Sequence, residues 1–363
     1  MVKILLSRHW SLQVTRTVII VSIAWWLLGS PNLLAQFGLV EEWPNTDFDK
    51  HSVPLSEIIS GGPGKDGIPA IDKPEFLRAG DDIDWLDDSE PVIALIMPGH
   101  SGAQHAKAYP IQILIWHEIV NDEIAGRPVV VTFCPLCNAS LVFDRRLDGT
   151  TLDFGTTGRL RKSDLVMYDR QTETWWQQFL GEAIVGELTG KKLDLIPSRI
   201  MSWADFRQSW PDGMVLSKDT SFYRSYGINP YQGYDDVNQT PFLLGETPDP
   251  RLSPMERIAV VKTEQGYRAY PYSMLEKAGV VHDVIDGKPI VFLTKKNTRS
   301  ALDKRLISES RLIISAQAFS PIVNGHQLEF YTSLDGKILD RQSNTIWSLS
   351  GQAEGGLFKG CLL

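Results

Sequence analysis

Short runs rich in Val, Ile and Phe, bounded by Gly or Asn, recur along the chain and predict β-strands. The predicted strands cover 92–96, 119–120, 128–133 and 141–143. One stretch has a helical spacing of apolar residues, at 111, 114 and 115. It predicts a short helix that begins after Tyr109-Pro110, because a residue before proline favours extended backbone. The pattern therefore favours strands with few short helices.

Two dipeptides between these runs predict tight hairpins. Asp148-Gly149 and Asn324-Gly325 each stand between apolar segments, and a type I′ turn requires the positive φ that Asp, Asn and Gly tolerate. Adjacent strands joined by such turns run antiparallel. The predicted fold class is α+β with predominantly antiparallel strands.

The chain also contains an internal repeat. Residues 109–137 align without a gap onto 270–298, at a constant offset of 161. Shared positions are of the types that shape turns and cores, such as Asp122/Asp283 and Gly126/Gly287. A later match pairs Asp169-Arg170 and Trp176 with Asp340-Arg341 and Trp347. We therefore expect an internal duplication that gives two pseudo-equivalent β-rich lobes.

The repeat and the composition of the intervening segments divide the chain into five parts. They are a signal peptide or N-terminal anchor (1–35), a Gly/Pro-rich segment (36–90), lobe 1 (91–210), a Tyr/Pro/Asn-rich connector (211–255) and lobe 2 (256–363). Lobe 2 has an insertion around 299–312, whereas lobe 1 is longer between 154 and 169. Lobe 2 ends before the equivalent of 196–210, so its C-terminal element is expected to be missing.

Charge and the N-terminal pattern restrict the setting of the protein. A net charge of -8 and a pI near 5.4 argue against a nucleic-acid partner. Basic residues followed by the apolar run 18–28 are typical of an export signal, with an uncleaved anchor as the alternative. We expect an exported protein, periplasmic, extracellular or anchored facing outward, that meets the membrane only through an uncleaved N-terminal segment. A cell-envelope partner or a small ligand fits this setting.

The cysteines carry the clearest chemical signal. Of three cysteines, Cys134 and Cys137 form a Cys-Pro-Leu-Cys motif, and Cys361 stands alone near the end. Outside the cytoplasm such a pair is a structural disulfide, a redox couple or a metal site. The flanks VVVTF and NASLVF predict strand, turn and strand without a following helix. This favours the knuckle geometry of zinc-type sites over a thioredoxin fold.

Comparison of the two copies adds candidate partners. His117 and Glu118 precede the cysteine strand, and lobe 2 has Ala278 and Gly279 there while also lacking both cysteines. Joint loss is what a shared site predicts, although a packed or capping His117 remains the alternative. The candidate catalytic residues are Cys134, Cys137, His117 and Glu118, and the candidate metal ligands are Cys134, Cys137, His117 and Met167.

These residues leave two functions open. In the first, lobe 1 binds a soft metal ion, copper or zinc, or performs thiol chemistry, which would require an exposed sulfur with a lowered pKa. In the second, the protein is a non-enzymatic cell-envelope module. Its cysteines then form an inert disulfide, and its aromatic connector binds a partner or glycan.

Four segments together resemble a known family. KDGIPAID, YPIQILIWHEIVND, VTFCPLCNASLVFDR and SDLVMYDRQTETWWQQ are similar to the bacterial and archaeal family called domain of unknown function 3179, over about residues 55 to 360. The family pattern has Gly or Asn after the second cysteine, which Asn138 matches. The resemblance implies an exported protein and no particular activity. Family members continue past the point where this chain ends.

Overall fold

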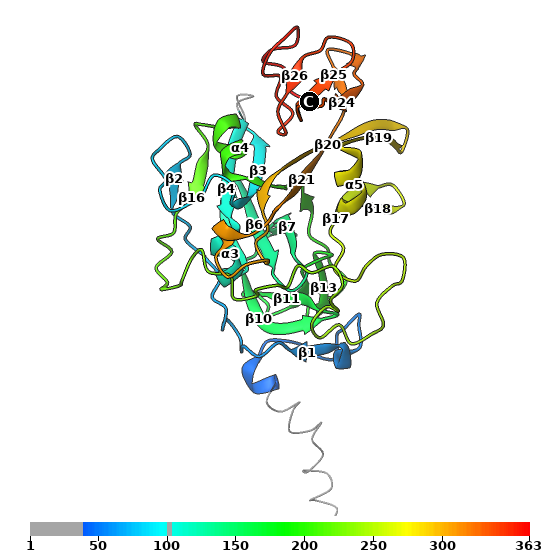
Figure 1. Ribbon diagram of the computed structural model, residues 1–363. Coiled ribbons are helices and arrows are strands. Elements are labelled where there is room, and N and C mark those ends of the chain that lie inside the picture. Colours follow the sequence, from blue (N-terminus) through cyan, green and yellow to red (C-terminus); the bar gives the residue numbers. More distant parts are fainter. Residues whose placement is uncertain (1–38, 100–103) are drawn as a thin grey trace, which may run out of the picture.

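The computed structural model describes residues 39–99 and 104–363, which form short sheets with few short helices (Figure 1). The sheets are mostly antiparallel, as predicted, and the parallel pairing of β16 with β4 is an exception. The signal or anchor predicted for 1–35 lies outside the described residues. Among the helices that are described, none is long and apolar enough to cross a membrane.

Lobe 1 contributes most of the strands of three sheets. The sheet strands, in chain order, are β1 (Ile58–Ser60), β2 (Phe76–Arg78), β3 (Pro91–Pro98), β4 (Gln104–Pro110), β5 (Ile119–Ile124), β6 (Arg127–Cys134), β7 (Ala139–Asp144), β10 (Phe154–Arg161), β11 (Asp164–Asp169), β12 (Trp175–Gln177), β13 (Glu182–Val185), β14 (Leu195–Ile196), β15 (Arg199–Ser202) and β16 (Met214–Leu216). The sheet orders are β1-β10-β11-β12-β13, β14-β7-β6-β5 and β15-β3-β4-β16-β2.

Helices and small hairpins complete this part of the chain. The helices are the 3₁₀ turn η1 (Leu55–Glu57), α3 (Ile111–His117) and α4 (Trp203–Ser209), and β8 (Arg146–Leu147) pairs with β9 (Thr150–Thr151). Asp148 and Gly149 join β8 and β9 with φ of 48° and 83°, which confirms the predicted hairpin turn. The predicted helix is also confirmed, since α3 begins directly after the strand that ends at Pro110.

Lobe 2 repeats the antiparallel arrangement on a smaller scale. Its strands are β17 (Ile258–Thr263), β18 (Gly266–Pro271), β19 (Val280–Ile285), β20 (Lys288–Arg299), β21 (Leu312–Phe319), β22 (Ile322–Val323), β23 (His326–Gln327), β24 (Phe330–Thr332), β25 (Ile338–Asp340) and β26 (Ile346–Trp347), with helices α5 (Tyr272–Ala278) and η2 (Ile307–Glu309). Asn324 and Gly325 form the β22–β23 turn with positive φ, as predicted.

Equivalent elements of the two lobes begin and end at equivalent residues. At an offset of 161, α3 matches α5 and β5 matches β19 at both ends. Their hydrogen bonds match too: the Tyr109 hydroxyl donates to Asp122 at 2.6 Å, and that of Tyr270 donates to Asp283 at 2.7 Å. Trp176 and Trp347 each donate from Nε1 to an aspartate seven residues earlier. The repeat thus reflects a shared local structure, while a duplication as its origin stays a prediction.

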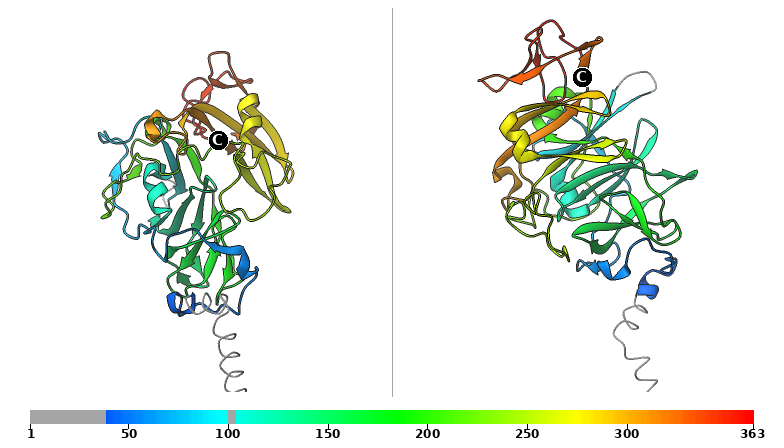
Figure 2. Two further views of the ribbon diagram at one scale, coloured as in Figure 1. Left: turned by 60° about the horizontal axis from the view of Figure 1, so that its bottom comes forward. Right: turned by 90° about the vertical axis from the view of Figure 1, so that its right-hand side faces the viewer.

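The core that positions the site surrounds α3. An apolar cluster includes Leu114 of α3, Val131 of β6 and Ile196 of β14. It also contains Ala301 and Leu302, which come from the insertion of lobe 2. Figures 1 and 2 show this orange insertion beside α3. Lobe 2 therefore completes the core of lobe 1.

Candidate functional site

The cysteine motif forms a knuckle between two antiparallel strands. Strand β6 ends at Cys134, β7 begins at Ala139, and the two residues pair across the hairpin. The amide of Cys137 donates to the carbonyl of Cys134 at 3.3 Å, and Asn138 has φ of 49°. The strand–turn–strand prediction is confirmed, and no helix follows the motif as it would in a thioredoxin.

A second hairpin brings Asp164 to the cysteines. The β10–β11 turn consists of Lys162 and Ser163, both with positive φ (52° and 68°), a conformation that is unfavourable for residues other than Gly, Asn and Asp. The turn carries the Ser163 carbonyl to 3.5 Å from Cys137 Sγ, and Asp164 Oδ1 lies 3.2 Å from the same sulfur. Ligand atoms of Cys134, Cys137 and Asp164 all lie within 4.8 Å of one another. We call these three residues the thiol–carboxylate cluster.

Glu118 stands where the backbone favours glycine. It caps α3 in the left-handed region with φ of 58°, and the equivalent cap of α5 is Gly279 with φ of 72°. A non-glycine residue in this conformation costs about 1 kcal/mol. Only 7% of Glu118 is exposed, and burial together with the nearby Asp164 raises the pKa of its carboxyl to about 8. Lobe 1 thus tolerates backbone strain and burial to keep a carboxyl group at this position.

The acidic groups of the cluster lack a counter-charge. Burial raises the pKa of Asp164 to about 6, although the Phe179 amide and Gln177 Nε2 each donate to its Oδ2 at 3.0 Å. Within the described residues neither Asp164 nor Glu118 forms an ion pair. Buried Asp144 of the same lobe, in contrast, pairs with Arg127 and Arg146. The cluster is therefore a buried set of acidic groups whose raised pKa values favour the protonated forms, and no cation of the described residues pairs with Asp164.

Both cysteines are free thiols, with their sulfurs 2.7 Å apart. Cys134 is 1% exposed, and Cys137 is half-buried. Burial, reinforced by Cys134 and Asp164, raises the pKa of the Cys137 thiol well above its usual value. A reactive thiol requires exposure and a lowered pKa. Cys137 therefore lacks the lowered pKa that we expected from the sequence for a reactive thiol.

The structure gives the other two predicted ligands different surroundings. Both ring nitrogens of His117 are occupied: Nδ1 lies 2.7 Å from the Pro69 carbonyl, and Nε2 lies 2.7 Å from the Tyr226 hydroxyl. Burial lowers the pKa of His117, which favours the neutral ring. Met167 is fully buried and packs in the apolar cluster that contains Cys134. Neither belongs to the thiol–carboxylate cluster.

Two connector residues that the sequence analysis did not select adjoin the site. Tyr231 and Tyr234 pack against the apolar cluster of α3. The pKa of Tyr231 is raised by burial and further by Glu118 and Cys134, and that of Tyr234 by burial and further by Cys137 and Cys134. Both tyrosines are therefore within electrostatic range of the cysteine sulfurs. The high aromatic content of the connector was the sequence signal that could have identified these two tyrosines.

Lobe 2 uses the equivalent positions for a different purpose. Lys295 replaces Cys134 and pairs with Asp205 of α4 at 2.6 Å. Asn297 donates to the same carboxylate at 2.7 Å. Thr298, which replaces Cys137, shares a buried hydrogen bond with Ser315. Strand β20 continues through these residues, with a bulge between Lys296 and Thr298, where β6 stops. The knuckle of lobe 1 therefore corresponds to an inter-lobe contact in lobe 2.

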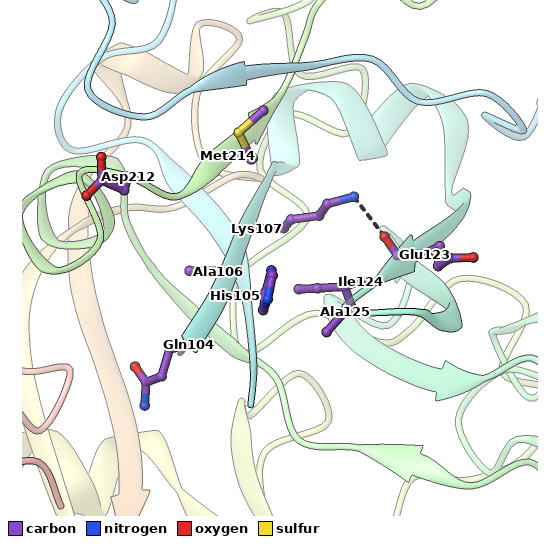
Figure 3. A pocket seen from close by; sticks show the side chains of 9 residues that line it. All are labelled: Gln104, His105, Ala106, Lys107, Glu123, Ile124, Ala125, Asp212 and Met214. Carbon is purple, nitrogen blue, oxygen red and sulfur yellow. Dashed lines mark hydrogen bonds between the residues drawn. The ribbon is translucent and has the colours of Figure 1, made fainter. Parts of the chain in front are cut away.

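The surface cavity of about 150 Å³ at β4 does not include the cysteines. It is lined by Gln104, His105, Ala106, Lys107, Glu123, Ile124, Ala125, Asp212 and Met214 (Figure 3). Its one lysine already binds Asp122 and the Glu123 carbonyl, at 2.8 and 2.9 Å. The lysine of this cavity is therefore already paired, and the cavity lies apart from the cysteine knuckle.

Comparison with known proteins agrees with the resemblance seen in the sequence. A search of curated proteins and a search of solved structures each return no match to this chain. A family model described as "Protein of unknown function (DUF3179)" matches residues 65–362, which contain the whole thiol–carboxylate cluster. The chain belongs to this family, DUF3179.

Proposed function

We propose that this protein binds one thiophilic metal ion, zinc or copper, through Cys134, Cys137 and Asp164 in lobe 1. The observation that carries the proposal is the buried cluster of two thiols and a carboxyl group without a neutralising residue. A bound cation would replace the protons of the two thiols, which would pass to solvent and leave thiolate ligands, and it would balance the charge of the Asp164 carboxylate.

The donor set narrows the kind of metal. Two sulfurs favour zinc or copper over magnesium or calcium, which prefer oxygen ligands. Thiolates that share one Zn²⁺ at about 2.3 Å lie roughly 3.7 Å apart, so the sulfurs must separate by about 1 Å from their present distance. A movement of this size is within the reach of χ1 changes at the turn.

Three protein ligands leave one position of a tetrahedral site open. Glu118, whose carboxyl group interacts electrostatically with Asp164, is the residue that we assign to act on a water or ligand at that position. A fourth ligand from Glu118 itself would instead give a closed, structural site. The residue types are compatible with both arrangements, so we propose metal binding without assigning a reaction.

The proposed location follows from the N-terminal pattern. Basic residues followed by the apolar run 18–28 support export. In an oxidising compartment a bound metal ion would keep the two adjacent thiols from forming a disulfide. Cell fractionation of the full chain, compared with a variant lacking residues 1–35, tests the location. Recovery of both in the cytoplasm contradicts it.

Metal analysis of protein purified without oxygen tests the binding. About one equivalent of zinc or copper per chain is expected, with loss of that metal in a Cys134→Ser/Cys137→Ser variant. The matched control is Cys361→Ser, which removes the remaining cysteine and should retain the metal. A metal-free wild-type protein that reconstitutes with neither ion, and whose cysteines form a disulfide, contradicts the proposal.

A further inference from the structure

The connector segment 226–235, which we call the strap, packs on the α3 core beside the cysteine strand and is bound both to lobe 1 and to the insertion of lobe 2. On the lobe 1 side, the Tyr226 hydroxyl bonds His117 at 2.7 Å, and Trp116 Nε1 donates to the Ile228 carbonyl at 3.1 Å. Both bonds come from adjacent residues at the end of helix α3. His117 therefore anchors the strap, which gives this buried histidine a role other than metal ligation.

On the other side, the strap is bound by the insertion of lobe 2 at 299–312. The amide of Asn229 donates to the Arg305 carbonyl at 2.8 Å, and that of Gly233 donates to the Leu302 carbonyl at 2.7 Å. Ile228 also forms a β-bridge with Leu306. Since Leu302 is fully buried in the α3 core, these bonds fix the strap to a rigid base.

One ion pair closes the end of the strap. Asp235 is 7% exposed, and its carboxylate pairs with Arg311 at 2.7 Å while accepting a hydrogen bond from Ser300. Arg311 also donates to the Asp235 carbonyl at 3.2 Å. A buried carboxylate that loses its cation is costly, so this contact resists opening of the strap.

Between these attachments, Tyr231 and Tyr234 pack on the apolar cluster of α3, which includes Phe133, the residue before Cys134. The Tyr234 hydroxyl accepts a hydrogen bond from the Phe242 amide at 2.6 Å. The β10–β11 turn, whose Ser163 carbonyl lies 3.5 Å from Cys137 Sγ, is tied to the connector as well, because Lys162 pairs with Glu246 at 2.8 Å. The connector thus contacts both α3 and the β10–β11 turn, the two elements that adjoin the knuckle.

We propose that the strap gates the cysteine site and that the insertion of lobe 2 holds it closed through Asp235 and Arg311. Lobe 2, which lacks the site, then controls access to the site of lobe 1. Control of metal exchange by the strap rests on the proposed function. Control of access to the two thiols does not.

Thiol labelling of metal-free, reduced protein tests the gate without any metal. In a Cys361→Ser background, the rate of reaction of Cys137 with an aromatic disulfide reagent is measured for Arg311→Met and Asp235→Asn. Each variant should react about 10-fold faster than the parent, because a buried polar group loses its partner. Arg311→Lys, which retains the charge, should stay near the parental rate.

The matched control is Arg341→Met, which removes an ion pair with Glu329 in lobe 2 away from the strap. It should leave the labelling rate unchanged. Equal rates in Arg311→Met, Asp235→Asn and the parent, or an equal increase in Arg341→Met, overturn the gate. If Asp235→Asn fails to fold, Arg311→Met, whose arginine is half exposed, still decides the question.

Metal release to a chelator separates this inference from the proposed function. If the wild-type protein holds a metal ion, release should accelerate in Arg311→Met by the same factor as labelling. Faster labelling in a protein that binds no metal would support the gate and contradict the metal proposal. Unchanged labelling in a protein that does bind metal would contradict the gate alone.

Discussion

Replacing Glu118 with Gln should stabilise the metal-free protein at neutral pH. The pKa of this buried carboxyl is raised from 4.5 to about 8, so the folded state binds the proton more tightly than the unfolded state does. Stability from this group is present below pH 4.5 and is lost as the pH rises toward 8. Gln has the same shape and never ionises, so the variant escapes this loss.

The magnitude follows from the shift. Keeping the proton on Glu118 at pH 7 costs roughly 3 kcal/mol relative to the unfolded chain, since each pKa unit corresponds to about 1.4 kcal/mol. The Gln amide must still be desolvated, so the net gain in unfolding free energy should be about 1–3 kcal/mol. The backbone strain at φ of 58° is common to both proteins and cancels.

Urea unfolding at pH 5, 6, 7 and 8 with a chelator present measures this effect. The free energy of unfolding of the wild type should fall across this range more steeply than that of Glu118→Gln, with the largest difference at pH 8. Glu123→Gln, which changes an exposed carboxylate on the next strand, is the control and should leave the curve unchanged. A Glu118→Gln protein that is less stable than wild type at pH 7 would refute the reasoning.

Three further variants test separate contacts. Asp164→Asn should weaken metal affinity by about 10-fold or more, measured by chelator competition, because it removes a charged ligand. The control Asp144→Asn, at the far end of strand β7, should leave the affinity unchanged. Equal effects of the two variants would contradict the assignment of Asp164. His117→Gln should retain the metal stoichiometry while raising the labelling rate of Cys137, since the ring nitrogens bond the Tyr226 hydroxyl of the strap and the Pro69 carbonyl rather than an ion. Loss of metal would restore His117 as a ligand. Lys295→Met should lower the free energy of unfolding by about 1–2 kcal/mol, because buried Asp205 loses its cation. The control Lys296→Met, which breaks an exposed pair with Glu276, should lower it by less than about 1 kcal/mol. Equal losses in the two variants would show that the inter-lobe contact does not stabilise the fold specifically.

The local fold was readable from the sequence because its signals are local. Pro110 sets the start of α3, the Asp-Gly and Asn-Gly pairs set two hairpins, and Val/Ile runs set strands β5 and β6. The cysteine knuckle followed from its flanks alone. Each of these features depends on residues close together in the sequence, where backbone preferences determine the local structure.

Asp164 was not selected because its role depends on contacts distant in sequence. In the sequence Asp164 belongs to a polar run with Asp169, Arg170 and Glu173, and the repeated Asp169-Arg170 pair favours a structural role for that run. Asp169 does hold a turn, since it accepts hydrogen bonds from Thr172 and Trp176. Only the β10–β11 hairpin brings Asp164 to Cys137. The sequence signal for Asp164 was its place in the segment between 154 and 169, which is longer in lobe 1 than the equivalent segment of lobe 2.

The repeat comparison separated scaffold from site for a physical reason. Tyr109 and Asp122 keep their hydrogen bond in lobe 2, because it supports the hairpin in both lobes. Glu118 and Cys134 do not support a hairpin in this way. In lobe 2 Gly279 replaces Glu118 and fits the left-handed backbone, and Lys295 replaces Cys134 and forms the inter-lobe ion pair. His117 differs between the lobes as well, yet the structure connects it to the strap. A difference between copies therefore indicates specialisation of lobe 1 without specifying the chemistry.

X-ray absorption spectroscopy at the metal K-edge tests the central claim most directly. Protein loaded with one equivalent of zinc or copper, with Cys361→Ser to remove the other cysteine, should show two sulfur neighbours, at about 2.3 Å for zinc, with lighter oxygen neighbours completing the shell. The Cys134→Ser/Cys137→Ser protein should show none. A first shell of nitrogen and oxygen atoms without sulfur in the loaded protein would contradict a metal site at the cysteine knuckle.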